Sequence, residues 1–146
     1  EIEGWEAGAP PPVDLAIERR NGDFVRALIP EARVSACHDV SDGGLAVALA
    51  EMALASGASG IGAKVTAPEG ILLHAWLFGE DQGRYIVTTA DAKGLLAAAD
   101  KAGVPAMQIG ITGADGLSLI GGEAETVLEE LRQIHESWLP EYMAGP

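Results

Sequence analysis

The fold is decided by the stretch His38-Asp39-Val40-Ser41-Asp42-Gly43-Gly44-Leu45, which joins a short β-favouring run to an alanine-rich segment. The run before it, Val34–Cys37, predicts a strand. The segment after it, Leu45–Ala55, repeats apolar residues at helical spacing and predicts a buried helix that ends near Gly57. A strand, a glycine turn and a buried helix in this order indicate an α/β domain.

The rest of the sequence alternates predicted helices and strands. Asp14 is placed to cap a helix that Pro30 ends. The turn Gly113–Gly116 predicts that the strands on either side of it pair as a hairpin. Together the elements predict an α/β sandwich with a mixed sheet. The further strands are expected at 61–65, 84–89, 107–111 and 117–120, and the further helices at 71–78, 91–102 and from 127 to about 138.

Length and charge limit the classes of function. A chain of 146 residues has the size of one ordinary domain. Its net charge of −13 repels nucleic acid and anionic membrane surfaces, so we expect neither as a partner. The single cysteine, Cys37, cannot form an internal disulfide, and no apolar run reaches the roughly 18 residues that a membrane span needs. These features predict a cytoplasmic protein.

The first residues have the composition of a linker. Gly4, Gly8 and the triplet Pro10-Pro11-Pro12 precede any periodic pattern, and the sequence starts without a methionine. We therefore expect residues 1–12 to be the tail of a preceding domain, and residues 13–146 to be one domain of a longer protein.

The turn before the alanine-rich helix is the first candidate site. Gly43 and Gly44 leave the first backbone N–H groups of the helix open to a close approach, and the helix dipole favours an anion. We expect Asp42, Gly43 and Gly44 to bind a nucleotide phosphate, with Asp39 and Asp42 holding a bridging Mg²⁺. The alternative is that Asp42 or Ser41 caps the helix and the glycines form only a tight turn.

The loop Gly79–Arg84 is the second candidate site. Glu80 and Asp81 offer carboxylate oxygens, which Mg²⁺ prefers as ligands. Gln82 can donate to a phosphate oxygen, and Arg84 can clamp a phosphate through two hydrogen bonds. The alternative is a solvated loop without a ligand.

The acidic residues of the two candidate sites stand near strand ends. Loops at strand ends gather at one edge of an α/β sheet, where carboxylates repel one another. A divalent cation or a basic surface of the preceding domain would relieve this repulsion. We therefore expect Mg²⁺ and nucleotide to bind here only when that domain is present. The four predicted metal ligands are Asp39, Asp42, Glu80 and Asp81.

Several stretches are similar to one known family. The run His38–Ala53 resembles its main signature, and Phe78-Gly79-Glu80 followed by Arg84 resembles its second. Pro11–Leu15 looks like the entry into its last domain, and His135–Gly145 resembles the ending of its small bacterial members. On these residues the chain is identified as a member of the synthetase-subunit family of phosphoribosylformylglycinamidine synthase.

This resemblance implies a fold and a reaction. The fold is a three-layer α/β sandwich with a mixed sheet, of the aminoimidazole ribonucleotide synthetase C-terminal type, and the chain resembles the second of two such domains in its subunit. The reaction is that of a ligase of purine biosynthesis: formylglycinamide ribonucleotide is activated by ATP with Mg²⁺ and amidated with ammonia. The implied partners are the preceding domains, a glutaminase subunit and a small accessory subunit.

The resemblance assigns no catalytic residue to this chain. The family's catalytic histidine and most of its metal ligands lie in the N-terminal domains, and its productive site lies in the first half of the subunit. The substrate loop there reads Glu-Ser-Gln-Glu-Arg, whereas here it reads Glu80-Asp81-Gln82-Gly83-Arg84. The isolated chain is therefore expected to be inactive, with a structural or an auxiliary nucleotide-binding role.

Two alternatives stay open on the sequence alone. The chain could be the C-terminal domain of another ATP-dependent member of the same superfamily, since these share the Asp-Gly-Gly turn but should lack the Trp138–Gly145 ending. It could also be a scaffold that holds its neighbours in place.

Overall fold

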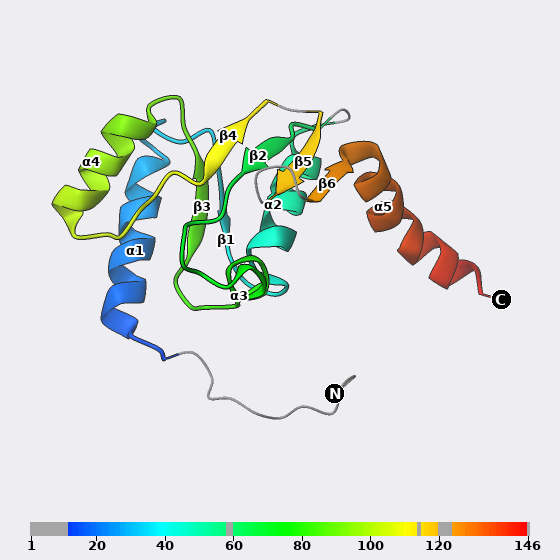
Figure 1. The fold of residues 1–146 in the computed structure, drawn as a ribbon, viewed down its shortest axis with the longest axis horizontal. Coiled ribbons are helices and arrows are strands. Elements are labelled where there is room, and N and C mark those ends of the chain that lie inside the picture. The colour runs from blue at the N-terminus through cyan, green and yellow to red at the C-terminus, as the bar shows by residue number, and fades with distance from the viewer. Residues whose placement is uncertain (1–11, 58–59, 114, 120–123, 146) are drawn as a thin grey trace.

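The structure is a computed structural model that describes residues 12–57, 60–113, 115–119 and 124–145 (Figure 1). The expected tail at residues 1–12 therefore lies outside the described residues except for Pro12. The elements follow one another as α1 (Leu15–Leu28), β1 (Ala36–Asp39), α2 (Gly44–Ala55), β2 (Ala63–Val65), α3 (Leu73–Phe78), β3 (Tyr85–Thr88), α4 (Ala92–Ala102), β4 (Gly110–Thr112), β5 (Gly116–Leu119), β6 (Ala124–Val127) and α5 (Leu128–Ala144).

The local signals for helix ends are confirmed. Asp14 caps α1, because its Oδ1 accepts hydrogen bonds from the backbone N–H groups of Ala16 and Ile17 at 2.9 and 3.1 Å. Asp91 caps α4 in the same way, by accepting from the N–H of Gly94 at 2.9 Å. These carboxylates satisfy donors that a helix start leaves without a partner.

The strands form two sheets. β1 and β3 pair antiparallel, with Cys37 opposite Val87. The second sheet has the order β4-β2-β5-β6, in which β2 and β5 are parallel and the other pairs are antiparallel. The expectation of a mixed sheet is confirmed.

The predicted hairpin between β4 and β5 is wrong. β2 lies between these strands, with Ala63 opposite both Thr112 and Leu117. The connection crosses the end of β2, where the Gly113 N–H donates to the Gly62 carbonyl at 3.0 Å. Strands that flank a third lie about 9.5 Å apart, which the few residues between Thr112 and Gly116 can span. The antiparallel pair that does form joins β5 to β6, whose last residue, Val127, was expected to begin the last helix.

The helices cover both sides of the β1–β3 sheet. Figure 1 shows α1 and α4 on one side and α2 on the other. α2 contacts β1, β5, α3 and α5, so this alanine-rich helix is the centre of the core. The expected layered α/β sandwich is therefore confirmed. The main buried cluster consists of Val40, Leu45, Ala48, Leu49, Ala53, Ala63, Val65, Trp76, Leu77, Ile86, Leu117 and Leu128.

No helix in the described part of the chain is both long and apolar enough to cross a bilayer.

Candidate functional site

The glycine turn between β1 and α2 is a close-packed turn that only glycine fits. Gly43 and Gly44 have positive φ angles of 80° and 70°, which L side chains rarely adopt. A Cβ on Gly44 would lie 2.7 Å from the carbonyl carbon of Phe78 and 2.8 Å from the carbonyl oxygen of Leu77. The start of α2 therefore rests directly on the backbone at the end of α3.

A side chain from the second candidate loop occupies the N-terminus of α2. The Gly43 N–H donates to Oε1 of Glu80 at 2.9 Å, and no side chain of the turn itself caps the helix. The alternative that Asp42 or Ser41 caps α2 is therefore wrong. A carboxylate is the kind of group that a helix N-terminus favours, and here the chain supplies it from 37 residues away.

Arg84 is held within its own loop. Its Nη1 donates to the Gly79 carbonyl at 3.2 Å and to Oδ2 of Asp81 at 3.3 Å, and its side chain is 28% exposed. The guanidinium therefore stabilises the loop that carries Glu80, and part of its donor capacity is taken by these two acceptors.

The loop is also fixed to α1. Asn21 Nδ2 donates to the Gly83 carbonyl at 3.1 Å, and a Cβ on Gly83 would lie 2.9 Å from Cγ of Glu18. Glu18 Oε1 is buried without a hydrogen-bond partner in the described residues. Sequence reasoning missed Glu18, because its place beside Gly83 depends on a packing contact between segments far apart in the chain.

A cavity of about 300 Å³ joins the two candidate loops. Four carboxylate residues line it, Glu18, Asp39, Asp42 and Glu80, together with Gln82. The structure thus brings four of the eight predicted site residues to one cavity, namely Asp39, Asp42, Glu80 and Gln82. Asp81 and Arg84 pair with each other and are not among the residues that line this cavity.

The carboxylates do not form a metal cluster by themselves. No three His, Cys, Asp or Glu side chains of the described residues are grouped so that they could hold a metal ion. The prediction that Asp39, Asp42, Glu80 and Asp81 bind Mg²⁺ together with a preceding domain is not tested by this chain.

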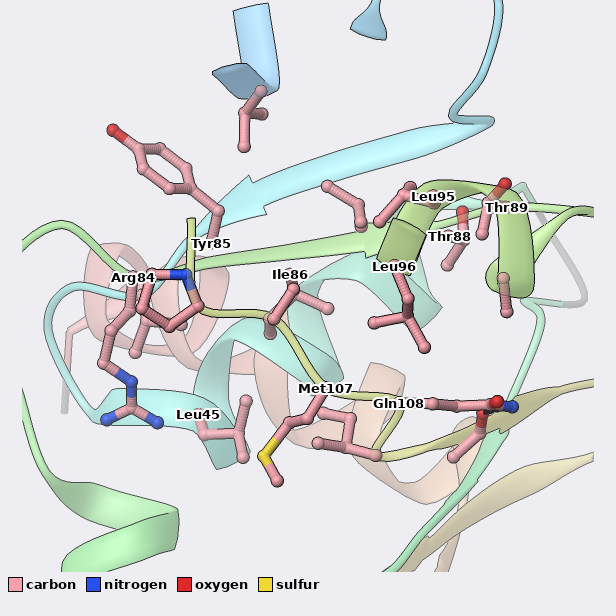
Figure 2. Close-up of a pocket in the computed structure, with 18 of the residues that line it drawn as sticks. Leu45, Arg84, Tyr85, Ile86, Thr88, Thr89, Leu95, Leu96, Met107 and Gln108 are labelled. Atoms are coloured by element: carbon pink, nitrogen blue, oxygen red, sulfur yellow. Dashed lines mark hydrogen bonds between the residues drawn. The ribbon is translucent and has the colours of Figure 1, made fainter. Parts of the chain in front are cut away.

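A larger cavity of about 810 Å³ lies between β3, α4 and the segment that leads into β4 (Figure 2). Leu95 and Leu96 of α4 and Met107 line it, with Leu45 and Arg84 at one end. The described residues that line it are mostly apolar and include no group of titratable side chains, so they offer packing surface and no evident chemistry.

The surroundings of Cys37 in β1 do not activate its thiol as a nucleophile. Desolvation raises the pKa of the Cys37 thiol, and the Asp39 carboxylate raises it further. A raised pKa keeps the thiol in its unreactive protonated form. His38 lies with Nε2 at 3.3 Å from Oε2 of Glu51 on α2.

A known family matches most of the chain. The family described as "AIR synthase related protein, C-terminal domain" matches residues 1–122. The chain belongs to this family. The AIR synthase related C-terminal type is the fold that the resemblance at His38–Ala53 and at Phe78-Gly79-Glu80 implied.

The relatives of this family member are synthase subunits. It is 59% identical, over 99% of its length, to the "Phosphoribosylformylglycinamidine synthase subunit PurL" of Methylocella silvestris, and 55% identical over 96% of its length to the subunit of the same name in Parvibaculum lavamentivorans. The chain spans about a fifth of the length of these relatives, 20% and 19%.

Solved structures share the fold of this AIR synthase related domain. "T. maritima PurL complexed with FGAR" has a TM-score of 0.69 at 20% identity and aligns with 88% of the chain, using 23% of its own length. "T. maritima PurL complexed with ATP" has a TM-score of 0.64 at 18% identity and aligns with 77% of the chain, using 21% of its own length.

Proposed function

We propose that this chain is the C-terminal domain of the synthetase subunit of phosphoribosylformylglycinamidine synthase. The observation that carries the proposal is its 59% identity, over almost its whole length, to the subunit from Methylocella silvestris. Because it spans a fifth of that subunit, it contributes one part of the enzyme and no complete active site.

The proposed reaction is that of a ligase of de novo purine biosynthesis. The full-length subunit uses ATP to amidate formylglycinamide ribonucleotide with ammonia from glutamine. The Thermotoga maritima relatives were solved with FGAR and with ATP, which supports this substrate and this nucleotide. Cys37 is no candidate for releasing ammonia from glutamine, since its thiol has a raised pKa.

The proposed partners are the preceding domains of the same subunit, the glutaminase subunit and the small accessory subunit, in the cytoplasm. A Thermotoga maritima structure named "PurLQS" supports an assembly of several subunits. The net charge of −13 argues against nucleic acid and anionic membranes as additional partners.

The residues of this chain alone do not fit a nucleotide phosphate with Mg²⁺. Glu80 already accepts from the N–H at the start of α2, Arg84 is paired with Asp81, and the cavity between the loops is lined by carboxylates. Carboxylates at this edge repel a phosphate. In the chain by itself, the Glu80 contact favours a structural role, in which the two loops lock α2 against α3.

We propose that the site is completed only in the full-length subunit. There, a basic group of the preceding domain would neutralise the acidic edge. Asp42, Gly43, Gly44, Gln82 and Arg84 are then the proposed nucleotide-binding residues. The proposed Mg²⁺ ligands are Asp39, Asp42, Glu80 and Asp81.

The function is tested by replacing the matching segment of the Methylocella silvestris subunit with this chain; we call the product the chimeric subunit. We expect it to restore growth without purines in a bacterium that lacks its own synthetase subunit. The same subunit carrying Gly44→Val, which breaks the start of α2, should fail to restore growth. A chimeric subunit that is stably produced but never supports growth contradicts the proposal.

A scaffold role is the second candidate, and the hydrogen bond between Glu80 and Gly43 favours it. It predicts that Asp42→Asn in the chimeric subunit leaves nucleotide binding and growth unchanged. A nucleotide site at this edge predicts that Asp42→Asn weakens nucleotide binding.

A further inference from the structure

The last helix, α5, carries an apolar face that passes from buried to exposed along its length. At its start, Leu128 is 3% exposed and Leu131 packs against the core. Beyond them, Figure 1 shows α5 extending away from the rest of the domain. The large apolar side chains on this outer part are exposed, with Trp138 at 65% and Tyr142 at 71%. We call the set Ile134, Trp138, Leu139, Tyr142 and Met143 the outer face of α5.

The outer face continues the buried face of the same helix. Ile134, Trp138 and Tyr142 follow one another at a spacing of four residues, which places them in one row on a helix. Leu131, three residues earlier, begins this row. The rings of Trp138 and Tyr142 are stacked, with their centroids 5.4 Å apart and an angle of 8° between their planes. The helix thus presents a stacked aromatic surface that the described residues of the domain leave largely exposed.

An ordered row of this kind is typical of a helix that lies in an apolar groove. Such helices use anchors at i, i+4 and i+7 or i+8. Large aromatic side chains dominate the binding energy of protein interfaces. A contiguous exposed apolar surface on a domain marks an interaction site.

The negative charge of α5 limits which partner surfaces can bind it. The helix carries four glutamates against one arginine, and the whole chain has a net charge of −13. A second copy of the chain would bring the same charge to the contact, and like charges across an interface are unfavourable. The partner surface that fits is an apolar groove with a basic rim.

α5 lies outside the segment that matches the family model but inside the segment that is similar to the synthase subunits. The match to the AIR synthase related family ends at residue 122, before α5, whereas the similarity to the Methylocella silvestris subunit covers 99% of the chain. About four-fifths of that subunit lies outside the chain. A surface joined to α5 in one polypeptide meets it at a high effective concentration.

We propose that the outer face of α5 docks into a basic-rimmed apolar groove on the part of the same subunit that lies outside this chain. This inference rests on the proposed function, because it requires the chain to be part of a longer subunit. The helix would then act as a strap that fixes the last domain to the domains before it.

Hydrogen exchange measured by mass spectrometry tests the proposal. The peptide that covers residues 131–145 is followed in the 146-residue chain and in the chimeric subunit. We expect its amides to exchange more slowly, by about tenfold or more, in the chimeric subunit without any other subunit added than in the 146-residue chain, at all protein concentrations. Trp138→Ser with Tyr142→Ser should abolish this protection. The control Glu141→Gln removes a charge that is not part of the outer face and should keep it.

Three results would overturn the proposal: no added protection, protection that rises with protein concentration, which indicates a second copy, or protection only after the glutaminase is added. Growth complementation is measured on the same chimeric subunit. Complementation without protection refutes the docking of α5 and leaves the proposed function standing. Protection without complementation supports the docking and contradicts the proposed function. If the chimeric subunit does not fold, the same exchange experiment is made on the 146-residue chain mixed with the remaining part of the Methylocella silvestris subunit.

Discussion

Replacing Gly44 by alanine tests the close-packed turn at the start of α2. The substitution places a Cβ on a residue with a φ of 70°, and this Cβ would lie 2.7 Å from the Phe78 carbonyl carbon and 2.8 Å from the Leu77 carbonyl oxygen. Ordinary carbon contacts are about 3.5–4.0 Å, so the backbone of α3 or of the turn must shift.

The expected loss of stability has three parts. The left-handed φ costs a residue with a Cβ about 1–2 kcal/mol. Forcing a methyl group against packed atoms costs about 1–3 kcal/mol. Alanine also restricts the unfolded chain, which stabilises the folded state by about 0.4–1 kcal/mol. The net expectation for Gly44→Ala is a loss of about 1–4.6 kcal/mol in the free energy of unfolding, and Gly44→Val should lose at least as much.

Gly103 supplies a matched control. Its φ of 67° is nearly that of Gly44, but a Cβ there meets nothing within 4 Å. Gly103→Ala should therefore carry the φ penalty without the steric contact, a net loss of about 0–1.6 kcal/mol.

The assay is equilibrium unfolding of the 146-residue chain in urea, followed by circular dichroism, with a cooperative transition required for the comparison. If Gly44→Ala costs no more than Gly103→Ala, within about 0.5 kcal/mol, the contact between the turn and α3 is refuted.

Three further predictions concern single contacts. Glu80→Ala removes the acceptor for the Gly43 N–H and should lower the free energy of unfolding by about 0.5–2 kcal/mol in the same urea assay, with a smaller loss for Glu80→Gln, which keeps an acceptor; equal stability of all three proteins would contradict the cap. Arg132 donates to the carbonyls of Leu54 and Gly57 at the end of α2. Arg132→Met should therefore lower the free energy of unfolding by about 1–2 kcal/mol in the urea assay, and Arg132→Lys by less; an unchanged free energy in both variants would refute this contact. The pKa of Cys37 is raised mainly by desolvation and further by Asp39, so the rate of its reaction with Ellman's reagent should rise with pH at a midpoint above that of free cysteine. Asp39→Asn should lower this midpoint only partly. A midpoint at or below that of free cysteine would contradict both causes.

Signals carried by neighbouring residues were sufficient to predict the helices. The carboxylates of Asp14 and Asp91 act on N–H groups two or three residues away, and the spacing of apolar residues identifies a helix even where, as on the outer part of α5, that face is exposed. The turn at Gly43 and Gly44 was predictable for the same reason, because φ is a property of single residues.

Contacts between distant segments were not predictable in this way. The hairpin expected around Gly113 fails because β2, about fifty residues earlier in the chain, takes the place between the two strands. The cap on α2 comes from Glu80 instead of a neighbouring side chain, and Glu18 meets the second loop only through the packing of α1. Each of these depends on three-dimensional packing that composition and spacing do not contain.

We propose that the acidic edge formed by the two loops belongs to a nucleotide site that the rest of the subunit completes. Calorimetric titration of Mg²⁺ with ATP into the 146-residue chain and into the chimeric subunit tests it most directly. We expect no saturable binding to the 146-residue chain, and binding to the chimeric subunit with a stoichiometry that falls when Asp42→Asn is introduced. Saturable binding to the 146-residue chain, or a stoichiometry that Asp42→Asn leaves unchanged, would contradict it.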